Sequence, residues 1–224
     1  MTDKKICMGI LTCPKTKNRF NKFMDIHKEK LEKLGIDYYV ILSDPSLVKS
    51  NKKYRIKGRI FYCAIKEAYE VLAHKMAIFY SYIYNETDYD FVYKIDDGCL
   101  LNMDELLNTN YDYGGGLMVP TNNKCHINKC LNKKFNKIGL DFRHNFHKLK
   151  NIDKKKLANI TKIKYAGGGY GYGLSRKALS FIPHYLDHIL SVPLSYEDVI
   201  FGQIMYLSDI KPVYKYIGNY HKVK

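Results

Sequence analysis

Two adjacent carboxylates, Asp96 and Asp97, end an apolar stretch of this sequence and are followed by Gly98. The apolar run before them, residues 91–95, shows no polar alternation, which is typical of a strand buried on both faces. Because ligands of open α/β sheets bind where strands end, both acids are expected at a binding edge. Neighbouring carboxylates repel each other unless a cation or a fixed hydrogen-bond donor lies between them, and a divalent ion that holds a polyphosphate meets that need. Asp-Asp-Gly is also ordinary turn chemistry, so the motif alone leaves both interpretations open.

A second candidate for ligand binding is the segment 167–173, in which five glycines are interleaved with tyrosines. Glycines let the backbone approach a ligand closely. Tyrosine rings can stack on a sugar face and donate hydroxyl hydrogen bonds. A flexible turn between a strand and a helix explains the glycines equally well, but it explains the interleaved tyrosines poorly.

Two more acids, Glu197 and Asp198, open a segment with helical periodicity. Carboxylates in a first helical turn are favoured by the helix dipole, so this pair has a structural explanation beside a functional one. His221 is a single histidine in a basic C-terminal stretch. It gains interest only from the motifs that precede it.

Apolar periodicity predicts the elements that position these residues. The alternation of strands and helices favours βαβ units and a mostly parallel sheet. No dinucleotide-binding glycine fingerprint follows the first strand. The polar, basic segment 121–162 is typical of an insertion or an acceptor-side loop. The expected elements are strands at 5–12, 37–43, 91–95 and 113–119, and helices at 18–34 (ended by Gly35), 60–84, 174–190 (ended or kinked at Pro183) and 197–207.

The composition describes a folded, basic chain. Its 224 residues fit one domain, and 46% hydrophobic with 14% aromatic residues argues against disorder. The formal net charge of +15 suggests nucleic acid as a partner. The lysines and arginines are scattered, however, and no nucleic-acid-binding motif accompanies them. We therefore attribute the charge to a solvated surface whose positive field attracts anionic ligands, nucleotide-sugars included.

Cysteine usage and hydropathy bear on the compartment. The six cysteines form no Cys-x-x-Cys pair, which favours a reducing compartment over a disulfide framework. Cys125, His126 and Cys130 form the only cluster with zinc-like spacing, and they lack a second pair. No apolar window reaches the length of a membrane span, so a cytosolic protein is expected.

The order of the motifs resembles that of GT-A glycosyltransferases, most closely the Fringe and β-1,3-galactosyltransferase superfamily. That family has a Lys-x-Asp-Asp-Asp element followed by an apolar run and Asn, to which residues 94–102 are similar. Its Gly-Gly-Gly-Tyr-Val-Leu-Ser-like element resembles residues 167–175, and its Glu-Asp-Val-x-x-Gly element resembles residues 197–202. Residues 69–75 are similar to its Tyr-x-x-Leu-x-x-Lys helix. The third Asp of the acidic element, which helps hold the metal in many members, is Gly98 here.

The resemblance implies a GT-A-like nucleotide-sugar-binding fold in a single domain, with a nucleotide-binding half at 1–110 and an acceptor-binding half at 111–224. It also implies a metal-dependent, inverting transfer of a sugar from a nucleoside diphosphate, expected to be UDP, to a hydroxyl of a carbohydrate or glycosylated acceptor. The implied cofactor is Mn²⁺ or Mg²⁺. The alternatives are a transferase-like protein that binds carbohydrate with little or no turnover, and a basic nucleic-acid-associated protein.

The same resemblance implies roles for single residues. Asp198 is the expected general base, and Asp97 and His221 are the expected metal ligands. The expected donor-binding residues are Thr12, Asp44, Lys75, Asp96 and Asp97. The expected acceptor- and sugar-binding residues are Gly167, Gly168, Gly169, Tyr170 and Glu197.

Overall fold

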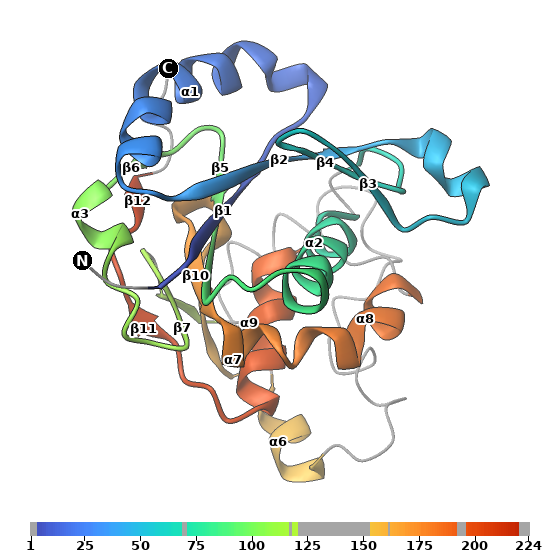
Figure 1. Cartoon of the computed structure of the whole chain (residues 1–224). Helices are drawn as coiled ribbons and strands as arrows, with labels where there is room; N and C mark the ends of the chain where they lie inside the picture. Colours follow the sequence, from blue (N-terminus) through green and yellow to red (C-terminus); the bar gives the residue numbers. More distant parts are fainter. Residues whose placement is uncertain are drawn as a thin grey trace.

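A computed structural model describes residues 4–68, 71–116, 118–120, 153–160, 162–191 and 196–219 of the chain. Within these residues the main feature is an eight-stranded sheet with helices on both faces (Figure 1). In sheet order its strands are β11 (Val213–Tyr214), β7 (Tyr113–Gly115), β10 (Tyr172–Ser175), β5 (Phe91–Asp96), β1 (Ile6–Leu11), β2 (Asp37–Ser43), β4 (Ile60–Cys63) and β3 (Tyr54–Lys57).

Helices and two small sheets complete the described part of the fold. The small sheets pair β6 (Leu100–Leu101) with β12 (Gly218–Asn219), and β8 (Met118–Pro120) with β9 (Lys164–Ala166). The α-helices are α1 (Lys17–Lys33), α2 (Leu72–Glu86), α3 (Met103–Leu106), α6 (Lys154–Asn159), α7 (Arg176–Leu179), α8 (Ile182–Ser191) and α9 (Glu197–Leu207). Short 3-10 helices are η1 (Pro14–Thr16), η2 (Pro45–Ser50) and η5 (Gly168–Tyr170).

The centre of the main sheet is parallel. Strands β4, β2, β1 and β5 run in one direction, whereas β10 is antiparallel between β5 and β7. In the register of β1, Leu11 lies opposite both Ile41 and Asp96. The carboxyl ends of β1, β2 and β5 therefore share one edge of the sheet. The prediction of a mixed, mostly parallel sheet flanked by helices is confirmed.

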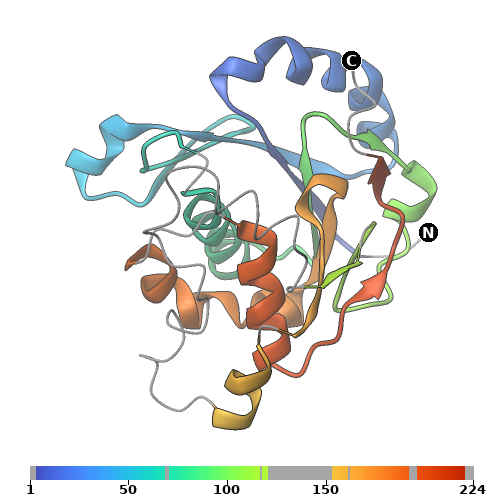
Figure 2. The ribbon, with the colours of Figure 1, turned by 180° about the vertical axis from the view of Figure 1, so that it is seen from behind.

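The two faces of the sheet are covered by different helices (Figures 1 and 2). Helix α1 packs on one face, where Met8 and Ile10 share an apolar cluster with Phe23 and Leu31. Helices α2, α7, α8 and α9 pack on the other face, in the cluster that contains Cys7. Successive strand residues point to opposite faces, so each central strand contributes to both clusters.

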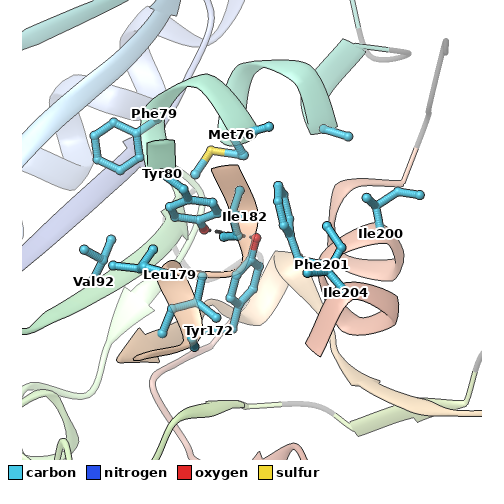
Figure 3. Packing of buried hydrophobic residues seen from close by; sticks show 14 of the residues in the cluster. Met76, Phe79, Tyr80, Val92, Tyr172, Leu179, Ile182, Ile200, Phe201 and Ile204 are labelled. Carbon is cyan, nitrogen blue, oxygen red and sulfur yellow. Dashed lines mark hydrogen bonds between the residues drawn. The ribbon is translucent and has the colours of Figure 1, made fainter. Parts of the chain in front are cut away.

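Figure 3 shows how the second cluster fixes α9 against α2 and β10. The Tyr80 hydroxyl of α2 donates to the Tyr172 hydroxyl of β10 at 3.0 Å, and the Phe201 ring of α9 meets the Tyr80 ring edge-on at 5.1 Å between centroids. Burial raises the pKa of both tyrosines well above the ordinary value. Both hydroxyls are therefore neutral and satisfy each other inside an apolar core.

The helix expected at 60–84 is wrong in its first part. Residues 60–63 form β4, whose side chains alternate between half-buried and buried, and α2 begins at Leu72. Both edges of β4 find partners, β2 on one side and β3 on the other. Those ladder hydrogen bonds override the helical periodicity that the apolar residues suggest.

Two other element predictions are corrected at their ends. The strand expected at 113–119 is two strands, β7 and β8, which belong to different sheets. Leu174 and Ser175 belong to β10 instead of a helix, because the Ser175 hydroxyl caps α7 by accepting the backbone N–H of Ala178. Pro183 is the second residue of α8, a position where a missing N–H costs no helical bond.

Several expectations fall outside the described residues. Residues 121–152 of the expected insertion are among them, together with Cys125, His126 and Cys130. The described cysteines Cys7, Cys13, Cys63 and Cys99 are free thiols. Among the described helices, none combines the length and apolar character needed to cross a membrane.

Candidate active site

A cavity of about 330 Å³ opens at the carboxyl ends of β1 and β5. This volume lies at the lower end of the range for small-molecule sites. Its lining comes from the turn after β1, the start of α1, the end of β5 and the segment before α2. The polar and charged residues on its wall are Thr12, Lys15, Thr16, Arg19, Glu67, Asp96 and Asp97.

Asp97 is fully buried and is held by three side chains from the turn after β1 and from α1. Its Oδ1 accepts from Arg19, with Nε at 2.7 Å and Nη2 at 2.5 Å. Its Oδ2 accepts from the hydroxyls of Thr12 and Thr16, each at 2.6 Å. A carboxylate has about four acceptor positions, so these four contacts use them all.

Asp96, one residue earlier, also lines the cavity and is paired with a lysine of its own strand. Its Oδ1 lies 2.7 Å from Nζ of Lys94, which is buried. The same Nζ lies 2.7 Å from Oε1 of Glu197 in α9 and donates to the carbonyl of Gly168 at 3.1 Å. Lys94 therefore joins the cavity edge to the glycine-rich segment and to the first turn of α9.

The third lining carboxylate, Glu67, is also paired with a cation. Nζ of Lys75 lies 2.9 Å from one oxygen of Glu67 and 3.0 Å from the other. It also donates to the Thr12 carbonyl at 3.4 Å. Lys75 is buried and is not among the lining residues, so it supports the wall of the cavity through Glu67 and Thr12.

The glycine-rich segment forms η5, which packs against the end of β5. The Gly168 amide donates to Oδ2 of Asp198 at 2.9 Å, and the Val199 amide donates to Oδ1 of Asp198 at 2.9 Å. The Gly169 carbonyl accepts from the Cys99 thiol. A Cβ at Gly168 would lie 2.6 Å from Oε1 of Glu197, so any side chain at this position would displace the Glu197 carboxylate. Asp198 itself is partly exposed beside this segment.

The electrostatics of the buried group are set by one lysine between two carboxylates. Burial opposes the charge on Lys94, but Asp96 and Glu197 outweigh it and raise the pKa of Lys94 well above the ordinary value. Burial raises the pKa of Glu197 from 4.5 to about 7, against the opposing charge of Lys94. Below about pH 7, Glu197 is therefore mostly protonated, and Asp96 is then the main partner of Lys94.

This raised pKa makes stability depend on pH with a definite sign. Between pH 4.5 and about 7, folded Glu197 keeps a proton that the unfolded chain has released, so the free energy of unfolding falls as pH rises. The variant Glu197→Gln has no carboxyl group to titrate at this position, so its free energy of unfolding should fall less steeply as pH rises. Urea unfolding of both proteins from about pH 4.5 to about pH 7 measures the difference. Equal pH slopes would show that Glu197 does not titrate in this window.

The structure brings together most of the residues that the sequence singled out, in two groups. Thr12, Asp96 and Asp97 line the cavity, while Glu197 and Asp198 lie beside η5. The second group also contains Gly167, Gly168, Gly169 and Tyr170, which lie in η5 or next to it.

Asp44 lies outside the set of residues that line the cavity. It caps η2, where Oδ1 accepts from the amide of Ser46, and Oδ2 lies 2.9 Å from Nη2 of Arg55. These structural contacts account for an acid at this position, so no bound ligand is needed to explain Asp44. Its donor-binding role, like the roles of the other named residues, stays a prediction.

The described residues do not fit the divalent ion expected from the sequence. Three His, Cys, Asp or Glu side chains close enough to hold a metal ion occur nowhere in the described part of the chain. The acceptor positions of Asp97 are occupied, Asp96 is paired with Lys94, and Gly98 stands at the third acidic position. His221 lies outside the described residues. Its role as a ligand, and the ion itself, stay predictions.

Comparison with known proteins decides the family. A family model described as galactosyltransferase matches residues 45–215, which is most of the chain. The chain belongs to the galactosyltransferase family. This is the Fringe and β-1,3-galactosyltransferase family, so the resemblance seen in the sequence is confirmed. A search of curated proteins returned no match.

Membership in the galactosyltransferase family identifies the chain as a glycosyltransferase that uses a sugar donor and an acceptor. The mostly parallel sheet with flanking helices is consistent with a GT-A-like fold. Thr12, Lys15, Thr16 and Arg19 precede the matched residues. These four lining residues therefore belong to a part of the site that the family match does not describe.

Sequence reasoning gave no site role to Arg19 or Lys94. Lys94 stands in the acidic element, two residues before Asp96, and its place in an apolar strand was a usable signal because a lysine is rarely buried unless it is paired. Arg19 carried no such signal. It is one of many basic residues in α1, and its contact with Asp97 joins positions 78 apart in the chain.

Proposed function

We propose that this galactosyltransferase-family member transfers a sugar from a nucleoside diphosphate donor, a UDP-sugar, to an acceptor hydroxyl. The configuration of the anomeric carbon is inverted in the transfer. The observation that carries this proposal is the Asp96–Lys94–Glu197 chain of contacts. It holds the first turn of α9, and with it Asp198, against the sheet edge where the cavity opens. A nucleotide in the cavity would have its sugar directed toward η5 and Asp198.

In the proposed reaction the acceptor oxygen attacks the anomeric carbon, the bond from that carbon to the diphosphate oxygen breaks, and the acceptor proton moves to Asp198. The Gly168 and Val199 amides orient the Asp198 carboxylate. Attack from the face opposite the leaving diphosphate inverts the configuration. We assign no step of the reaction to a divalent ion, because each carboxylate on the cavity wall is already paired with a cation of the chain.

A panel of nucleotide-sugars tests the proposal. We expect UDP-sugars to raise the melting temperature and to be hydrolysed slowly in the absence of an acceptor, whereas GDP-mannose does neither. NMR of the product formed with an active acceptor would show the inverted anomer. If no nucleotide-sugar stabilises the protein or is consumed, and RNA binds with a steep salt dependence, the nucleic-acid alternative is favoured.

A further inference from the structure

The cavity wall contains three carboxylates, and each is paired with a cation of the chain. Glu67 is paired with Lys75, Asp96 with Lys94 and Asp97 with Arg19. Carboxylates that bind a divalent ion offer their oxygens to it. Here both oxygens of Glu67 and Oδ1 of Asp96 face lysine nitrogens. Oδ1 of Asp97 faces arginine nitrogens, and its Oδ2 accepts from two threonine hydroxyls. The charge of the wall is thus compensated before any ligand or ion enters.

Arg19 has donors left for a ligand. Of the five N–H groups of an arginine, one on Nε and one on Nη2 contact Asp97. The second N–H of Nη2 and both N–H groups of Nη1 have no acceptor in the described part of the chain. The Arg19 side chain is 39% exposed and lines the cavity, in contrast to the buried Asp97. Asp97 and the two threonines therefore fix a guanidinium whose outer edge faces the cavity.

A second cation lies on the same wall. Lys15 is exposed and lines the cavity one turn before Arg19, and in the described part of the chain no carboxylate pairs with it. The cavity is also bordered by the start of α1, where the helix dipole favours an anion. Lys15, Arg19 and the start of α1 thus lie on one wall of the cavity, where they could bind a diphosphate together.

Gly98 connects this arrangement to the missing acid. A Cβ built on Gly98 would lie 3.5 Å from Cδ and Nε of Arg19, which is ordinary contact, and its backbone does not require glycine. The third acidic position of the family's element therefore faces the Arg19 side chain. In this chain Gly98 has no side chain at the position that would carry a carboxylate, and the Arg19 guanidinium lies beside it.

We propose that Arg19, assisted by Lys15, binds the donor diphosphate directly and neutralises the leaving group, so that UDP binding needs no divalent ion. This inference rests on the proposed function, since it names the groups that hold that donor. Arginine suits the task because its planar fork forms two parallel hydrogen bonds to phosphate oxygens. Its charge is permanent and stabilises the diphosphate as the bond between the anomeric carbon and the diphosphate oxygen breaks.

Calorimetry with UDP, in a chelator and then with Mn²⁺, tests the inference. We expect wild-type protein to bind UDP equally in both conditions, and Arg19→Gln and Lys15→Gln to bind it about 10- to 100-fold more weakly in the chelator, since each removes charged hydrogen bonds. Lys28→Gln removes the same charge from an exposed position of α1 that does not line the cavity, and it should bind UDP as wild type does.

Three further variants complete the test, and the first of them guards against misfolding. Arg19→Gln alone leaves the buried Asp97 charge without its partner, so the double variant Arg19→Gln/Asp97→Asn removes both charges and should fold yet still bind UDP weakly. Gly98→Asp places a carboxylate beside Arg19 and should weaken UDP binding in the chelator, whereas Gly98→Ala should not. Unchanged affinity in all of these variants would overturn the inference.

The outcomes also separate the two proposals. UDP binding that occurs only with Mn²⁺ and survives Arg19→Gln would overturn the role of Arg19 but leave the donor class intact. Absence of UDP binding in both conditions would overturn the proposed donor, and the role of Arg19 with it.

Discussion

Replacing Asp198 with asparagine is expected to lower kcat for sugar transfer by about 100- to 10,000-fold, the usual worth of a general base. Donor affinity should not change. Asparagine keeps a carbonyl oxygen that can accept from the Gly168 amide, so η5 keeps its position. Asparagine loses the contact of the second oxygen with the Val199 amide and the ability to take the acceptor proton. Initial-rate kinetics together with UDP calorimetry separate these two effects.

Glu197→Gln is the matched control for that experiment. Glu197 is the neighbouring acid, but its carboxylate faces Lys94 and Gly168 inside the protein. Glutamine keeps a carbonyl oxygen that can accept from Lys94, so α9 stays in place and the variant should keep substantial turnover. If Asp198→Asn transfers sugar at the wild-type rate, the base is another residue and the mechanism proposed for α9 is wrong.

The largest expected effect on stability comes from Lys94→Met. This change leaves the carboxylates of Asp96 and Glu197 without their shared cation, and Glu197 is almost fully buried. Breaking a buried ion pair by removing one partner costs about 3–5 kcal/mol of unfolding free energy. Chemical denaturation of the variant and of wild type at neutral pH measures the loss.

Two comparisons assign that loss to the buried group. Lys94→Met/Glu197→Gln removes one of the orphaned charges and should recover part of the stability. Lys53→Met breaks an exposed pair with Asp187, 3.5 Å apart, and should cost less than about 1 kcal/mol. A Lys94→Met protein as stable as Lys53→Met would show that the buried lysine does not hold the site together.

The sequence could predict the parts of the site that are local in the chain. The mostly apolar residues 91–95 indicate a buried strand and so place Asp96 and Asp97 at its end. Acids at the start of α9 are favoured by the helix dipole. The first helix and the second strand were also predictable, because periodicity and the stop at Gly35 (φ +66°) agree there. These signals need no knowledge of distant contacts.

The rest depended on contacts between distant segments. Nothing near residue 60 distinguishes a short apolar strand from the first turn of a helix, and only pairing with β2 and β3 decides it. Arg19 was missed for the same reason, because its importance comes from Asp97. The sequence predicted a divalent ion beside Asp97, and that ion stays a prediction. The sequence could not show that Arg19, 78 positions away, pairs with the same carboxylate.

Strand β10 lies between β5 and β7, although it follows both of them in the chain. During synthesis, the backbone amides and carbonyls on one edge of β5 therefore stay unpaired until residues 172–175 have been made. Such an edge invites pairing with other chains. Nascent or truncated forms that stop before β10 are thus expected to aggregate, and soluble expression should depend on chaperone capacity during synthesis.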